Sequence, residues 1–113
     1  MNRIASSLLV VFTLAVGAVA QPVTLVCAPT STRVVLDESA GTASYAGEDD
    51  RPASFTASQV VWDSYRKVAG DTMHTHLELN RDTGSLHVNY YSNGNHGAMS
   101  YECNVANPDN SRI

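Results

Sequence analysis

Positive charge is scarce in this chain. Lys and Arg together number 7 against 11 Asp and Glu, and the formal net charge is −4. The few basic residues form no patch or stripe, which argues against nucleic acid as a partner. No segment after residue 20 repeats its apolar residues with the 3.6-residue period of a helix. We interpret the acidic balance as a contribution to solubility.

Signatures of catalysis are also missing. The chain has no Gly-x-Ser-x-Gly elbow, and Ser100, which falls near His87 in the predicted sheet, has no strained turn beside it. Asp49 and Asp50 are adjacent in a charged loop, an arrangement typical of solvated charge rather than of catalytic acids in a cleft. We therefore expect a protein that is not an enzyme.

The first 20 residues have the features of a secretory signal peptide. Arg3 supplies the charged start, Leu8–Val16 the apolar centre, and Ala18–Ala20 the small-x-small cleavage site. The apolar run is too short for an ordinary membrane span. We expect a periplasmic or secreted protein that begins near Gln21 and has no membrane span after cleavage.

The chain contains only two cysteines, Cys27 and Cys103. Both follow the expected signal peptide, so both would meet an oxidising compartment. Each shares the parity of apolar neighbours in its strand, which points both sulfurs into the core. We predict a disulfide that joins the first strand to the last, worth roughly 4 to 5 kcal/mol on the chain-entropy model. The alternative, a reactive or metal-bound pair, lacks the C-x-x-C spacing.

The strongest structural signal lies in residues 73–103, where apolar residues alternate along three consecutive strands. Asn93–Gly94 is the pair typical of a two-residue hairpin turn. Arg81–Gly84 reads as a four-residue loop with glycine at the left-handed position. These turns fix a register in which apolar side chains meet on one face. The predicted pairs are Leu79–Leu86, Leu77–Val88, Leu86–Tyr101 and Val88–Met99.

Shorter strands precede this region. Glu48–Pro52 is predicted as a loop, because an acidic run and a proline disfavour a strand interior. The whole pattern indicates an all-β fold with one disulfide, an antiparallel meander closed as a small barrel or folded as a two-sheet sandwich. A single domain is expected over 21–106, with a flexible tail over 107–113. The predicted strands are Val23–Cys27, Arg33–Asp37, Thr42–Ala46, Ala53–Ala57 and Val60–Arg66. The expected core is Leu25, Leu36, Phe55, Trp62, Leu77, Leu79, Leu86, Val88 and Tyr101, with Tyr65 at its rim.

All four histidines fall on the outward face of the three-stranded sheet. A His-x-His pair on one strand, with a carboxylate and a cross-strand imidazole, suits Zn²⁺ or Cu²⁺. The alternative is a solvated face with ordinary surface histidines. Two further outward residues are candidates for a protein interface, because exposed tyrosine is common there. The candidate metal ligands are His74, His76, Glu78 and His87, and the candidate interface residues are Tyr91 and His96.

The second half of the chain contains, in this order, Phe55, Val60–Trp62, Leu79–Leu86 and Tyr101–Cys103. This pattern resembles that of small secreted proteins of Gram-negative bacteria with no assigned function. Those proteins have an aromatic-x-Trp strand, an Asn/Asp-Arg-x-Thr-Gly-x-Leu hairpin and a terminal Tyr-x-Cys. The resemblance covers roughly the last half of the chain and implies a fold and a compartment.

The chain is also similar to periplasmic inhibitors of c-type lysozyme in its signal peptide, its small acidic β domain and its terminal disulfide. It has no Ser-Gly-x-(Arg/Lys)-Tyr loop of that family. We expect a secreted or periplasmic, non-enzymatic binding or interaction module for a protein or small ligand. The two alternatives are a protein that binds zinc or copper on the histidine face, and a lysozyme-type enzyme inhibitor.

Overall fold

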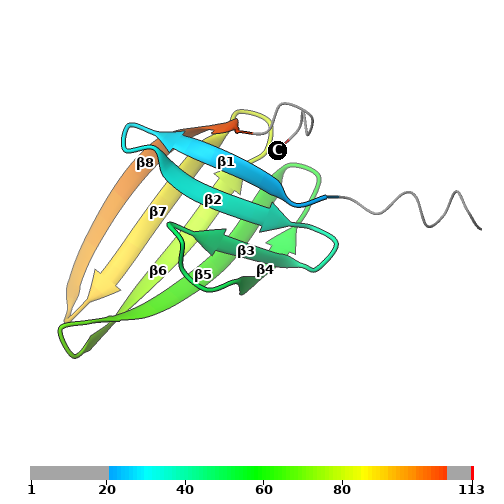
Figure 1. Cartoon of the computed structure of the whole chain (residues 1–113). Helices are drawn as coiled ribbons and strands as arrows, with labels where there is room; N and C mark the ends of the chain where they lie inside the picture. The colour runs from blue at the N-terminus through cyan, green and yellow to red at the C-terminus, as the bar shows by residue number, and fades with distance from the viewer. Residues whose placement is uncertain (1–20, 107–112) are drawn as a thin grey trace, which may run out of the picture.

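The chain folds into a closed antiparallel barrel in which every strand pairs with its sequence neighbours and β1 returns to pair with β8 (Figure 1). A computed structural model describes residues 21–106 and Ile113. The all-β prediction is confirmed, and the barrel replaces the sandwich alternative. The strands are β1 (Val23–Ala28), β2 (Thr32–Asp37), β3 (Thr42–Tyr45), β4 (Arg51–Phe55), β5 (Gln59–Val68), β6 (Asp71–Asn80), β7 (Ser85–Ser92) and β8 (Asn95–Val105).

Short turns with left-handed residues set the register of the long strands. Asn93 and Gly94, with φ of 54° and 78°, form the predicted turn between β7 and β8. Ala69 and Gly70, with φ of 52° and 87°, make a similar turn between β5 and β6. Two positive φ angles give the twist that suits a two-residue hairpin. All four predicted apolar pairs between β6, β7 and β8 are confirmed.

Inward-facing side chains fill the closed part of the barrel. Alternation along each strand places one face inside and one outside. Eight of the nine residues expected in the core are buried, and Phe55, the exception, is partly buried against the same cluster. The buried hydrophobic residues are Leu25, Cys27, Val34, Leu36, Ala43, Val60, Trp62, Leu77, Leu79, Leu86, Val88, Tyr101 and Cys103.

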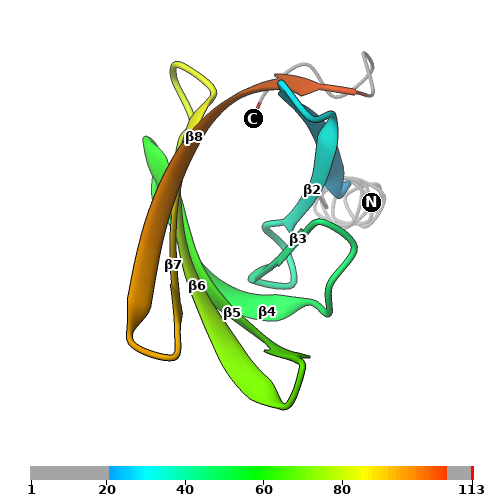
Figure 2. The same ribbon diagram turned by 90° about the vertical axis from the view of Figure 1, so that its left-hand side faces the viewer.

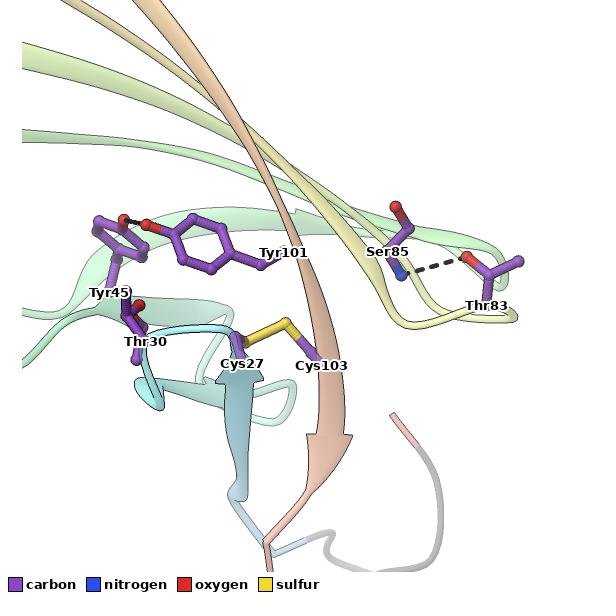
Figure 3. Close-up of a disulfide and its surroundings, with 8 residues drawn as sticks. Cys27, Thr30, Tyr45, Thr83, Ser85, Tyr101 and Cys103 are labelled. Atoms are coloured by element: carbon purple, nitrogen blue, oxygen red, sulfur yellow. Dashed lines mark hydrogen bonds between the residues drawn. A yellow bond between two sulfur atoms is a disulfide. The ribbon is translucent and has the colours of Figure 1, made fainter.

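The predicted disulfide joins Cys27 of β1 to Cys103 of β8 (Figure 3). The two residues lie directly opposite each other, with their Cα atoms 4.0 Å apart. The bond therefore links the first and last strands where the barrel closes. Beside it, the hydroxyl groups of Tyr45 and Tyr101 are hydrogen-bonded at 3.1 Å.

Some predicted boundaries were wrong. Arg51 and Pro52, expected in a loop, begin β4, and Pro52 pairs with Thr42. Proline is compatible with a strand near its start, where few ladder hydrogen bonds need its missing N–H group. Residues 1–20 and 107–112 lie outside the described part of the chain, so the signal peptide and most of the tail stay predictions. Ile113 packs against the core, and its main-chain oxygen accepts a hydrogen bond from Nε of Arg81 at 2.9 Å.

Strands β5 to β8 reach beyond the closed barrel (Figures 1 and 2). β4 pairs with β5 only over Val60–Trp62, and β1 pairs with β8 only over Glu102–Val105. We call the part of this sheet formed by residues 63–76 and 89–101 the extension. No helix in the described residues has the length and apolar character to cross a bilayer.

Met99 shows the consequence of this geometry. Sequence alternation placed it with the apolar residues, and it does lie on the inner face opposite Val88. It is nevertheless 37% exposed. Within the described residues, the inner face of the extension is covered only in part, because Ser64 and Thr75 are buried there whereas Met99 is exposed.

Candidate functional site at the open end of the barrel

A hollow of about 200 Å³ opens on the inner face where the extension leaves the barrel. Most of its wall is apolar, contributed by Met73 of β6, Val88 and Tyr90 of β7, and Met99 of β8. We call it the cup. Its complete lining is Tyr45, Glu48, Arg66, Met73, Thr75, Val88, Tyr90 and Met99.

Strand alternation positions the apolar wall. Met73 and Thr75 continue the inward parity of Leu77 along β6, and Thr75 pairs with Tyr90. Tyr90 in turn lies opposite Gly97, and its ring covers the position that a Cβ of Gly97 would occupy. Only glycine leaves room for the ring to lie flat along the strand. The cup therefore has a preformed aromatic wall.

Charged groups lie beside this apolar wall. A carboxylate oxygen of Glu48 accepts a short hydrogen bond from the buried hydroxyl of Ser64. The other oxygen lies 3.6 Å from Nε of Arg66, whose side chain is 55% exposed. Glu48 is thus held against the wall, while the guanidinium of Arg66 reaches solvent. An apolar wall with a few fixed polar groups is typical of small-molecule sites.

Tyr45 closes the side of the cup nearest the core. Its ring meets that of Tyr101 edge to face, with the ring centres 6.4 Å apart. Burial raises the pKa of the Tyr45 hydroxyl, and its hydrogen bond with Tyr101 raises it further. The hydroxyl of Tyr101 also contacts the sulfur of Met99 at 3.5 Å. These contacts connect the cup to the buried cluster at the disulfide.

The outer face of the extension carries a row of stacked rings, one from each strand. Tyr65, His74, Tyr91 and His96 lie side by side, with successive ring centres 4.6, 5.6 and 4.7 Å apart. Arg51 lies over the Tyr65 ring at 5.7 Å. The predicted exposure of Tyr91 is confirmed at 43%, and Tyr65 is also exposed at 47%. His74 and Tyr91, in the middle of the row, are each stacked between two neighbouring rings.

A hydrogen-bonded chain of carboxylates and imidazoles runs beside this row. Oδ1 of Asp63 lies 2.8 Å from Nε2 of His74 and 2.9 Å from Nδ1 of His76. Nε2 of His76 lies 3.0 Å from Glu78. The hydrogen bond to Asp63 raises the pKa of His76 above its usual value, and Glu78 adds to the effect. Burial alone would raise the pKa of Asp63, but the two histidines outweigh it and lower that pKa.

The four candidate metal ligands are divided between two arrangements. His74, His76 and Glu78 belong to the chain built around Asp63. His87 lies opposite Glu78, but its Nδ1 is hydrogen-bonded to Ser100 at 3.0 Å. No group of three or more His, Cys, Asp or Glu among the described residues is arranged to hold a metal ion. Metal binding by this face stays a prediction.

Sequence reasoning missed Asp63, Glu48 and Arg66. The signal for Asp63 was present, since Trp62 points inward and its neighbour must point outward. That Asp63 lies opposite His76 follows only from the register of β5 and β6, which the Ala69–Gly70 turn sets. Ala69 has a positive φ, which is unusual for alanine, so no clear sequence signal marks this turn. Glu48 is in a loop, so no strand pattern could place it beside Ser64.

Comparisons with protein-family models, with curated proteins and with solved structures find no match for this chain. Lysozyme inhibition and the resemblance to small secreted proteins therefore stay predictions.

Proposed function

We propose that the protein is a non-enzymatic, extracytoplasmic binding module that receives a small amphipathic molecule in the cup. The observation that carries the proposal is the cup itself, where Met73, Val88, Tyr90 and Met99 form an apolar wall around about 200 Å³. Eight-stranded barrels are wide enough to hold one small ligand at the mouth. The disulfide supports an oxidising compartment.

The volume limits the size of the ligand. Sites for drug-sized molecules occupy roughly 300 to 1,000 Å³, whereas an apolar cavity of about 150 Å³ takes one benzene ring. A cup of about 200 Å³ therefore fits a single ring or a short alkyl chain. The apolar part would contact the methionines, whose flexible thioethers adapt to different shapes. A polar end would face Arg66, the more exposed of the two charged groups.

Fluorescence titration with 1-anilinonaphthalene-8-sulfonate tests the proposal. The dye is larger than the cup, but it can place one apolar ring there and has a sulfonate for Arg66. We expect saturable one-to-one binding that Met99→Gln weakens about fivefold or more, since a loss of about 1 kcal/mol has that effect. Arg66→Gln should also weaken it.

Ser100→Gln is the matched control, because Ser100 is the next residue of β8 and faces the opposite side of the sheet. It should leave dye binding unchanged. Urea unfolding of each variant separates a damaged cup from a damaged fold. Dye binding that Met99→Gln and Ser100→Gln affect equally would contradict the proposal.

A further inference from the structure

One edge of the extension is left without a strand neighbour in the described residues. β1 covers β8 only from Glu102 to Val105, so Asn95–Tyr101 pairs with β7 on one side alone. The N–H group of Cys103 donates toward the β7 side, to Gly84 at 2.8 Å. The direction of the backbone N–H and C=O groups alternates along an antiparallel strand. In β8 the backbone groups of the odd-numbered residues therefore point toward β7. The N–H and C=O groups of His96, Ala98 and Ser100 then point away from the barrel.

This edge lacks the usual protection against pairing with another strand. Natural edge strands are shielded by charged residues, proline, bulges or covering loops. Asn95–Tyr101 contains no Asp, Glu, Lys, Arg or Pro, and His96, Ala98, Met99 and Ser100 are exposed. The opposite edge of the extension, on β5, has such protection. Arg66 and Lys67 lie there, and a guanidinium nitrogen of Arg51 donates to the carbonyl of Tyr65 at 3.3 Å.

We propose that two copies of the chain pair through this edge of β8 as a symmetric antiparallel dimer. The unpaired stretch is centred on Ala98, so a two-fold axis there uses its whole length. Ala98 then meets Ala98 of the second copy, and His96 meets its Ser100. A two-fold axis requires the surface to complement itself. The chain carries a net charge of −4, but this stretch has no Asp, Glu, Lys or Arg, so pairing two copies of it brings no like charges together.

The inner face of the paired strands also fits. Gly97 falls opposite Met99 of the second copy, so a large side chain meets a position with none. The Tyr90 ring that covers Gly97 would contact that thioether, a favourable pairing of sulfur with an aromatic ring. The two extensions would form one continuous sheet, with the cups on the same face. The dimer would place Met99 of each copy against the Tyr90 wall of the other copy's cup, and it forms whether or not the cup holds a ligand.

Cysteine cross-linking tests the axis directly. Residues that exchange hydrogen bonds across antiparallel strands have Cα atoms about 5.5 Å apart, within the range of a disulfide. In purified protein with the native disulfide intact, Ala98→Cys should form covalent dimers under mild oxidation. Asn104→Cys is the matched control, because Asn104 lies on the same face of β8 where β1 covers the edge.

Light scattering of the native protein over a concentration series gives the second measurement. We expect a dimer that Ala98→Lys converts to a monomer, since it places two like charges against each other, and that Asn104→Lys leaves intact. A monomer at all concentrations would overturn the inference. So would a dimer insensitive to Ala98→Lys, or cross-linking of Ala98→Cys no faster than that of Asn104→Cys. Pairing of the edge with an unrelated extended peptide would then be the separate alternative.

Discussion

Oδ1 of Asp63 lies 2.9 Å from Nδ1 of His76, directly across β5 and β6. The same oxygen is 2.8 Å from His74. An ionised carboxylate only accepts hydrogen bonds, so both imidazole nitrogens must donate. His76 faces carboxylates with both nitrogens and can donate from both only as the imidazolium. The pair therefore links the stability of the extension to pH.

The first prediction concerns that link. The pKa of His76 is raised on folding, so its stabilisation is complete below its unfolded pKa of about 6.5 and is lost as pH rises through the folded value. The pKa of Asp63 is lowered, so its contribution is present above about 3.9 and is lost as pH falls through the folded value. The urea midpoint should therefore contain a component that decreases as pH rises above about 6.5.

Asp63→Asn should reduce that component and lower stability near pH 6 by about 0.2 to 1 kcal/mol, the range for exposed ion pairs. Asp82→Asn is the control, because Asp82 lies in the exposed turn after β6. An unchanged pH profile in Asp63→Asn would show that the hydrogen-bonded chain contributes nothing to stability.

The second prediction tests the two faces of the barrel. Trp62 is 2% exposed in the core, so Trp62→Ala should lower the free energy of unfolding by about 3 to 5 kcal/mol. His96 only stacks on Tyr91 and contacts Asn89. His96→Ala should cost about 0.2 to 1 kcal/mol, as expected for a cross-strand pair. Equal urea midpoints for the two variants would refute this assignment of faces.

The third prediction compares two glycines with similar backbone angles. Gly84 and Gly47 have φ of 81° and 78°. A Cβ at Gly84 would lie 2.5 Å from the carbonyl oxygen of Cys103, whereas one at Gly47 would have nothing within 4 Å. Gly47→Ala should cost about 1 to 2 kcal/mol for the left-handed backbone alone. Gly84→Ala should cost clearly more in urea unfolding, and similar losses would mean that the close approach is relieved at no cost.

Much of the fold could be predicted because short-range signals determine it. The Asn93–Gly94 turn fixed the β7–β8 register, and alternation then assigned each side chain to a face. The disulfide prediction also placed the first strand beside the last, as the barrel requires. The strand order alone did not separate a barrel from a sandwich, because closure depends on how far the sheet coils.

The site was harder to predict. Alternation identifies the inner face of a strand but not whether other residues cover it. It placed Met99 on the apolar face opposite Val88 but could not show that Met99 lies exposed on the open extension. The cup exists because β5 to β8 are longer than the strands that pair with them at the barrel edges. That difference appears only when all the registers are known.

The fourth prediction concerns metal binding by the outer face. If His76 is a ligand, calorimetry at pH 7.5 should show one-to-one binding of Zn²⁺ or Cu²⁺, tighter than about 1 μM, that His76→Ala abolishes and His96→Ala retains. Affinity should fall as pH decreases through the raised pKa of His76, because ligand imidazoles must be deprotonated. Weak binding that is insensitive to His76→Ala would show that His76 is not a metal ligand.

Methionine-methyl NMR tests the cup most directly. Met73 and Met99 are the methionines of the described residues, and both line the cup. Hexanoate, with a short alkyl chain and a carboxylate for Arg66, is a suitable probe. At about 1 mM, even binding of about −4 kcal/mol would be visible. We predict that both methyl resonances shift with one shared midpoint and that Arg66→Gln raises this midpoint. Methyl resonances that do not move, or that move independently of each other, would contradict a ligand site in the cup.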